Sequence, residues 1–158
     1  MTRLEEVRAE INALAQSSPA AEDLMRAMAK LLHHKMLKYN WVGFYMLEPG
    51  AQPPVLVLGA FEGAMTPHTR IPLNQGICGA AASSGQTVVV DDVLQDSRYL
   101  ACSLETKSEI VVPVFSQGRV VGELDIDSHF PAAFTVQDQE FVQHCARLVG
   151  KELETAGA

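Results

Sequence analysis

The feature that most constrains the fold is a pair of β-branched segments separated by only four residues. Residues 109–115 (EIVVPVF) and 120–127 (VVGELDID) are rich in Val and Ile, which is typical of strands. The turn between them contains Gly118, and a connection this short joins strands that run antiparallel. We therefore predict a β-hairpin in this part of the chain, with the pairing of its first strand limited on one edge by Pro113.

The preceding part of the chain predicts a second hairpin and a few shorter elements. Residues 41–47 and 55–61 are aromatic and β-branched, and the turn between them is rich in Gly and Pro. Residues 62–72 have few strand or helix signals and are expected to form a loop. A short glycine-bounded helix over about 80–84 and a short strand at 87–90 are predicted to follow.

Helices are predicted at both ends of the chain. Apolar residues at helical spacing indicate helices over about 4–16 and 19–38, and a closing helix after Thr135. Ser18 is expected to cap the second helix, and Thr135 with Asp138 resembles a cap of the closing one. Antiparallel strand pairs between terminal helices predict an α+β fold, in which an antiparallel sheet carries the N- and C-terminal helices on one face.

Length and composition indicate one soluble domain. The chain has 158 residues, of which 47% are apolar, so residues 1–158 are expected to form a single domain with its own core. The net charge of −7 argues against a general binder of nucleic acid or of anionic membranes, because both require a basic surface. Without a membrane-spanning run or a signal peptide, a cytoplasmic location is expected, where the three cysteines stay as thiols.

Two of the three cysteines lie in the least regular segments. Cys78 lies at the start of the glycine-flanked helix, where unpaired N–H groups and the helix dipole favour a thiolate. The alternative is that Cys78 is a small core residue. Cys102 follows in a polar segment, where a thiol has less structural reason to occur. Cys145 lies on the apolar face of the closing helix and is expected to be a core residue.

Three carboxylates are predicted to gather beside the C-terminal hairpin. Asp125 and Asp127 alternate along one strand and so point to the same face, and the hairpin brings Glu109 close to them. Like charges so placed repel unless one takes a proton or a cation bridges them. A solvated sheet face is the simpler alternative. A metal site is a further option, but no His lies at a ligand-like spacing within this cluster, and no metal ligand is assigned.

Seven short blocks in this order resemble one known family. They are residues 40–45 (NWVGFY), 70–72 (RIP), 76–79 (GICG), 101–102 (AC), 108–113 (SEIVVP), 124–128 (LDIDS) and 134–138 (FTVQD). Together they resemble the free methionine-(R)-sulfoxide reductases, which are single GAF domains. The resemblance covers most of the chain and implies a GAF core over 39–153. The N-terminal helices over 1–38, predicted from their apolar spacing, could form the face of a homodimer, which is a common arrangement.

The resemblance also implies roles for particular residues. Cys102 matches the catalytic cysteine of the family, and Cys78 matches a second, resolving cysteine. Three positions match the carboxylates that hold the free amino acid, and two match the aromatic wall around its methyl group: Glu109, Asp125 and Asp127, and Trp41 and Tyr45. No bound cofactor is implied, and thioredoxin or another dithiol would act as reductant.

The sequence departs from the family pattern in two places. His68 occupies a position where the family carries a further cysteine, which commonly resolves the catalytic one. The residues around Cys102 also differ, since the family's flanking His and Asp are absent. Two hypotheses therefore follow: a reductase of free methionine-(R)-sulfoxide, and a GAF-type small-molecule binding or sensor module without catalysis.

Overall fold

A computed structural model describes residues 1–100 and 104–156 of the chain. Its core is a six-stranded sheet in the order β3-β2-β1-β6-β5-β4, in which every neighbouring pair is antiparallel. The strands are β1 (Trp41–Leu47), β2 (Val55–Glu62), β3 (Arg70–Pro72), β4 (Val88–Val90), β5 (Ser108–Ser116) and β6 (Arg119–Ser128). The predicted C-terminal hairpin is β5 with β6, and the second hairpin is β1 with β2. The α+β fold with an antiparallel sheet is thus confirmed.

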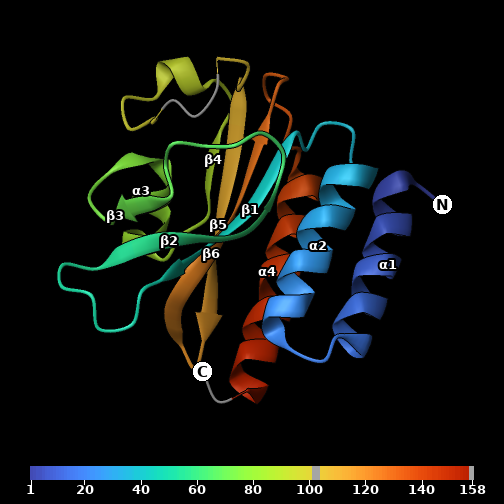
Figure 1. The fold of residues 1–158 in the computed structure, drawn as a ribbon. Helices are drawn as coiled ribbons and strands as arrows, with labels where there is room; N and C mark the ends of the chain where they lie inside the picture. Colours follow the sequence, from blue (N-terminus) through green and yellow to red (C-terminus); the bar gives the residue numbers. More distant parts are fainter. Residues whose placement is uncertain (101–103, 157–158) are drawn as a thin grey trace.

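Three long helices cover one face of this sheet, as predicted (Figure 1). They are α1 (Arg3–Ser17), α2 (Ala21–Lys35) and α4 (Val136–Thr155). Helix α4 packs on β5 and α2 packs on β1 and β2, while α1 contacts both other helices. The short helix α3 (Gly76–Ser84) contacts β5 and β6 and lies on the other side of the sheet, together with the 3₁₀ turn at Val93–Gln95.

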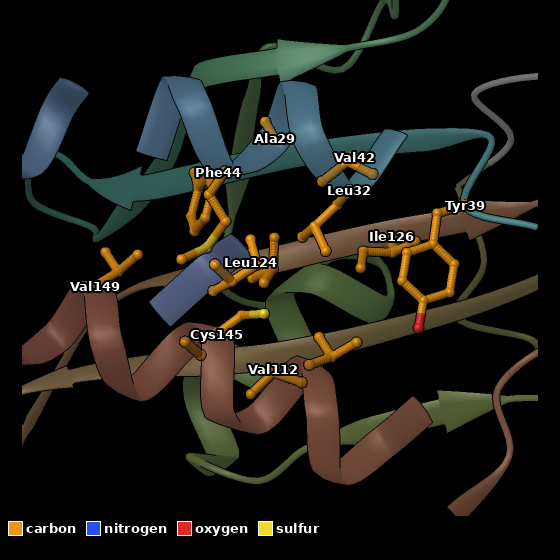
Figure 2. Packing of buried hydrophobic residues seen from close by; sticks show 14 of the residues in the cluster. Ala29, Leu32, Tyr39, Val42, Phe44, Val112, Leu124, Ile126, Cys145 and Val149 are labelled. Carbon is orange, nitrogen blue, oxygen red and sulfur yellow. The ribbon is translucent and has the colours of Figure 1, made fainter. Parts of the chain in front are cut away.

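The main core lies between the sheet and the three long helices (Figure 2). Leu124 and Ile126 of β6 point into it and meet Cys145 and Val149 of α4, all of them with no exposed surface. Cys145 is therefore a core residue, as expected. Because side chains alternate along a strand, the residues next to Leu124 and Ile126 in β6 point to the opposite face of the sheet, toward α3.

Helix ends account for one confirmed prediction and one wrong one. Thr135 and Asp138 form a reciprocal capping box at the start of α4, with backbone-to-side-chain distances of 3.0 and 3.2 Å. Ser18 does not cap α2. Its hydroxyl donates instead to the carbonyl of Leu14 at 2.7 Å and so ends α1, while α2 begins after Ala20 without a side-chain cap.

The expected loop at 62–72 contains a strand that the sequence did not indicate. The last three residues form β3, which pairs with β2 at the edge of the sheet. Arg70 in this strand also forms an ion pair with Glu48, at 2.9 Å. This strand has only one buried side chain, Ile71, so it shows no local pattern and depends on its neighbour. No helix in the described part of the chain combines the length and the apolar character needed to cross a bilayer.

Candidate functional site

The three predicted carboxylates lie together on the face of the sheet that α3 covers. Glu109 of β5 is the direct partner of Asp127 of β6, and Asp125 lies two residues away on the same face. Their side chains are buried, with relative exposures of 6% for Glu109, 3% for Asp125 and 4% for Asp127. The hairpin therefore brings the three acids together as predicted, and the alternative of a solvated sheet face is wrong.

Burial dominates the electrostatics of this cluster. Loss of water raises the pKa of Glu109 well above its usual range, and the neighbouring charges of Asp125 and Asp127 raise it further. Burial likewise raises the pKa of Asp127 and, less strongly, of Asp125, whose hydrogen bonds favour its charged form. Oδ1 of Asp125 and Oδ1 of Asp127 are buried without a hydrogen-bond partner in the described structure. The cluster therefore favours proton retention or a positively charged ligand.

Cys78 approaches the acids from the first turn of α3. Its thiol is only 6% exposed and donates a hydrogen bond to Oδ2 of Asp125 at 3.5 Å. Burial raises the pKa of Cys78 well above its usual value, and the charges of Asp125, Glu123 and Glu109 add to this. The structure therefore opposes the expected thiolate. The helix start does supply unpaired N–H groups, but burial beside three acids has the larger effect on this sulfur.

Cys102, the predicted catalytic cysteine, lies outside the described residues. The described residue nearest to it on its N-terminal side is Leu100, which lines a small cavity together with Cys78, Glu109 and Asp125. Leu100 also packs on Gly76 at the start of α3, where a Cβ would lie 2.9 Å from a Leu100 methyl carbon. The chain thus passes beside the acids just before it reaches Cys102.

The two predicted aromatic residues come from β1, which pairs with β6 on the side opposite to β5. Trp41 is the direct partner of Asp127, and Tyr45 is the partner of Glu123, so both rings lie on the face that carries the acids. Their ring centroids are 6.3 Å apart, and Trp41 stacks on Phe61 at 5.7 Å. Trp41 Nε1 donates to the carbonyl of Ala64 at 2.9 Å. The pair forms a fixed aromatic wall beside the acid cluster.

His68, the residue that departs from the family pattern, lines the same cavity as Cys78. Its carbonyl accepts a hydrogen bond from the Tyr45 hydroxyl at 2.7 Å, and its N–H donates to Thr66 Oγ1 at 3.1 Å. A second hollow has Trp41, Thr66 and Asp127 in its lining, so the acid cluster borders two small spaces.

Glu123 is a fourth carboxyl of this face that the sequence interpretation missed. It lies two residues before Asp125 on β6, has no exposed surface, and is close enough to Cys78 to raise the pKa of that thiol. Burial also raises the pKa of Glu123 itself well above its usual range. The signal was present, because Glu123, Asp125 and Asp127 alternate in the same way along one strand.

One set of these side chains has the geometry of a metal-ligand group. The sulfur of Cys78 and one carboxylate oxygen each of Glu109 and Asp125 all lie within 4.8 Å of one another. The two carboxyl groups of this set come from the strands, whose sequence pattern predicted that they lie together. The thiol of Cys78 comes from α3 and was not part of that pattern.

Comparisons with known proteins give a consistent result. The model of the GAF domain family matches residues 20–153. The chain is 32% identical to the free methionine-R-sulfoxide reductase of Escherichia coli K12 over 146 aligned residues. The aligned region covers 92% of this chain and 86% of that protein.

Two solved structures also resemble the chain over most of its length. One is the free methionine-R-sulfoxide reductase of Neisseria meningitidis in complex with its substrate, with a TM-score of 0.89 and 34% identity, covering 98% of this chain and 92% of that one. The other is the type II free methionine-R-sulfoxide reductase of Thermoplasma acidophilum, with a TM-score of 0.79 and 40% identity, covering 90% and 96%.

Proposed function

This chain belongs to the GAF-domain family of free methionine-R-sulfoxide reductases, and we propose that it reduces free L-methionine-(R)-sulfoxide to L-methionine. The reaction is that of the relatives named above. The residues proposed for it are Cys102 as nucleophile, Cys78 as resolving thiol, and the acid and aromatic side chains of the same face as the substrate site.

The buried row of carboxylates is the observation that carries this proposal. Three acids are shielded from water, and two of them present an oxygen without a hydrogen-bond partner in the described structure. The ammonium group of a free amino acid supplies three N–H donors and a positive charge, which such oxygens require. A methionine within a polypeptide lacks this ammonium. The cluster therefore favours a free amino acid over a protein-bound residue.

The other end of the substrate is assigned to the aromatic wall. Trp41 and Tyr45 lie on the same face as the acids and offer apolar ring surface for the methyl group beside the sulfoxide. A ligand held at both ends presents its sulfur to the space between them. Leu100 lines this region, and Cys102 follows two residues later in the chain.

Two thiols act in turn in the proposed reaction. The Cys102 thiol gives its proton to a carboxylate of the site as its sulfur bonds to the sulfoxide sulfur. The S–O bond and the transient bond between the two sulfurs then break as the protonated oxygen passes to the Cys102 sulfur, which releases methionine and leaves Cys102 as a sulfenic acid. An acid must protonate the oxygen during this step, and the raised pKa of Glu109 makes it a suitable donor. Cys78 then attacks the sulfenic acid, which forms a disulfide and releases water.

Cys78 needs a base to act as the resolving thiol. Its raised pKa means that the thiol, not the thiolate, is the resting form. Asp125 Oδ2 already accepts its hydrogen bond at 3.5 Å and can take the proton as the new S–S bond forms. Thioredoxin or another dithiol then reduces the disulfide by exchange, without any bound cofactor.

The cellular setting of the proposal is the cytoplasm, where dithiol reductants are maintained. A homodimer through the N-terminal helices remains a prediction. The surface between α1 and α2 has an apolar floor that includes Ala13, Leu14, Ala27 and Leu31. Light scattering of the purified chain, compared with a Leu31→Glu variant, tests whether this surface mediates self-association.

Methionine formation tests the reductase directly. We expect purified protein with dithiothreitol to convert free L-methionine-(R)-sulfoxide, and to leave the (S) epimer and the N-acetylated (R) compound unchanged. Cys102→Ser is expected to abolish turnover, and Cys145→Ala, a change in the distant core, to retain it. Asp125→Asn removes one charged partner of the ammonium and is expected to lower kcat/KM by about 10- to 100-fold. No methionine from the wild-type protein would refute the proposal.

The second candidate is a GAF-type binding module without catalysis. It is favoured by His68 at the position of a family cysteine and by the raised pKa of Cys78, since both weaken the resolving chemistry. This function predicts stoichiometric binding of methionine sulfoxide by calorimetry, unchanged in Cys102→Ser, with no product formed. Turnover with a dithiol decides between the two.

A further inference from the structure

Three potential metal ligands converge from three separate elements. Cys78 comes from α3, Glu109 from β5 and Asp125 from β6, and one donor atom of each lies within 4.8 Å of the other two. All three side chains are more than nine-tenths buried. A thiol and two carboxyl groups are thus held at the spacing of a coordination sphere by the packing of the helix on the sheet.

Unpaired buried oxygens give a second and independent indication of a ligand. Oδ1 of Asp125 and both carboxyl oxygens of Glu123 have no hydrogen-bond partner within the described structure. Among residues 1–100 and 104–156, none of the acids of this face forms an ion pair with Lys, Arg or His. Buried polar atoms are normally satisfied, so this cluster lacks a positive partner.

The space beside these ligands has the size of one ion. The cavity lined by Tyr45, His68, Cys78, Glu109 and Asp125 has a volume of about 20 Å³. About 10–15 Å³ is enough for one water molecule. A metal ion or a single water therefore fits this cavity as it stands, whereas a whole amino acid needs additional space.

We propose that Cys78, Glu109 and Asp125 bind one divalent transition-metal ion of the Zn²⁺ type. Sulfur and carboxylate oxygen are both ligands that Zn²⁺ accepts, and three protein ligands leave a fourth position open. Mg²⁺ and Ca²⁺ prefer oxygen ligands alone and are poorly matched to the sulfur of Cys78. On binding, the metal–sulfur bond replaces the S–H bond and one proton is released to solvent, with no change in oxidation state.

This ion would compete with the amino acid for the same carboxylates. Glu109 and Asp125 cannot bind the metal and the substrate ammonium at once, and a metal-bound Cys78 cannot act as resolving thiol. The metal is therefore an inhibitor of the reduction. This second statement rests on the proposed function, whereas metal binding itself does not.

Cobalt provides a direct spectroscopic probe of the first statement. A Cys102→Ala variant leaves Cys78 and the core residue Cys145 as the only thiols, so that a thiolate-to-cobalt charge-transfer band reports on Cys78. We expect one equivalent of Co²⁺ to produce this band and Zn²⁺ to abolish it by displacement. Adding Cys78→Ser should remove the band.

Matched carboxylate variants test the remaining ligands. Asp125→Asn is expected to weaken Co²⁺ binding by at least about tenfold, a loss that even outer partners of metal ligands cause. Glu140→Gln, the same type of change at an exposed site on α4, should leave binding unchanged. A missing band, or a band that survives Cys78→Ser, would overturn the metal site.

The competition is tested separately. Zn²⁺ titrations of the Cys102→Ala protein by calorimetry are expected to show a weaker apparent affinity when methionine sulfoxide is present at increasing concentrations. Unchanged affinity at saturating sulfoxide would refute the competition while leaving the metal site in place. A wild-type protein that stays inactive after metal is removed with a chelator, and that still gives the cobalt band, would refute the reductase alone.

Discussion

Replacing Glu123 by Met is expected to make the protein more stable. Glu123 has no exposed surface, and neither of its carboxyl oxygens has a hydrogen-bond partner in the described structure. Its neighbours across the sheet are Tyr45 and Pro113, and the Cys78 thiol approaches it from α3; none of the three supplies a positive charge. Met has a similar length and flexibility and no group that needs water, so it fills the same space without the unsatisfied polar atoms.

The size of the effect follows from the cost of that unsatisfied group. A buried polar group without a partner costs about 1–3 kcal/mol. Removing it should raise the free energy of unfolding by about 2 kcal/mol. For a chain of this length, 1 kcal/mol shifts Tm by about 2–4 °C, so we expect Glu123→Met to raise Tm by roughly 4–8 °C.

Urea and thermal unfolding, followed by circular dichroism with a chelator present, measure this change. Glu140→Met is the matched control, because it makes the same substitution at an exposed position of α4 and should change stability by less than about 0.5 kcal/mol. An unchanged m-value would show that the denatured state is the same in both proteins. If Glu123→Met is destabilised, Glu123 has a stabilising partner and the reasoning from unpaired oxygens is wrong.

Three further changes test other parts of the structure. Gly79→Ala places a Cβ 2.8 Å from the carbonyl oxygen of Leu73, so we expect a loss of about 1–3 kcal/mol in urea unfolding and lower activity through displacement of Cys78. Tyr39→Phe removes the donor of a 2.6 Å hydrogen bond to a carboxylate of α4, and its thermal unfolding should show a loss of about 1–2 kcal/mol. Burial lowers the pKa of His144 below its unfolded value near 6.5, so the unfolded chain binds the proton more readily than the folded one. The free energy of unfolding should therefore fall as the pH drops below 6.5. His144→Gln should flatten this pH dependence in urea unfolding.

Local patterns were sufficient to predict the central part of the fold. The four-residue turn and the alternation of apolar and acidic residues set the pairing of β5 with β6, so the approach of Glu109 to Asp127 followed from the sequence. The cap at Thr135 is likewise a local arrangement of residues three apart. Such features depend on neighbours in the chain, which a sequence displays directly.

Features that depend on distant parts of the chain were missed. Strand β3 exists because β2 offers it an edge, and Ser18 bonds back to α1 although its position also suits a cap of α2. The state of Cys78 is the clearest case. Its helix start is visible in the sequence, but the three acids that raise its pKa come from β5 and β6, and only the tertiary structure brings them to the sulfur.

The buried acids also explain why one small site can select among several positive partners. Glu109, Glu123, Asp125 and Asp127 share one face of the sheet, and burial raises the pKa of each. A proton, an ammonium group and a divalent metal each relieve the same deficit of positive charge, so each weakens the binding of the others. A proton is small and leaves the cavity open. Under the two proposals above, an ammonium would bring the sulfoxide to the aromatic wall, whereas a metal would bind Cys78. If both proposals hold, the partner that neutralises the acids determines whether the thiol chemistry proceeds.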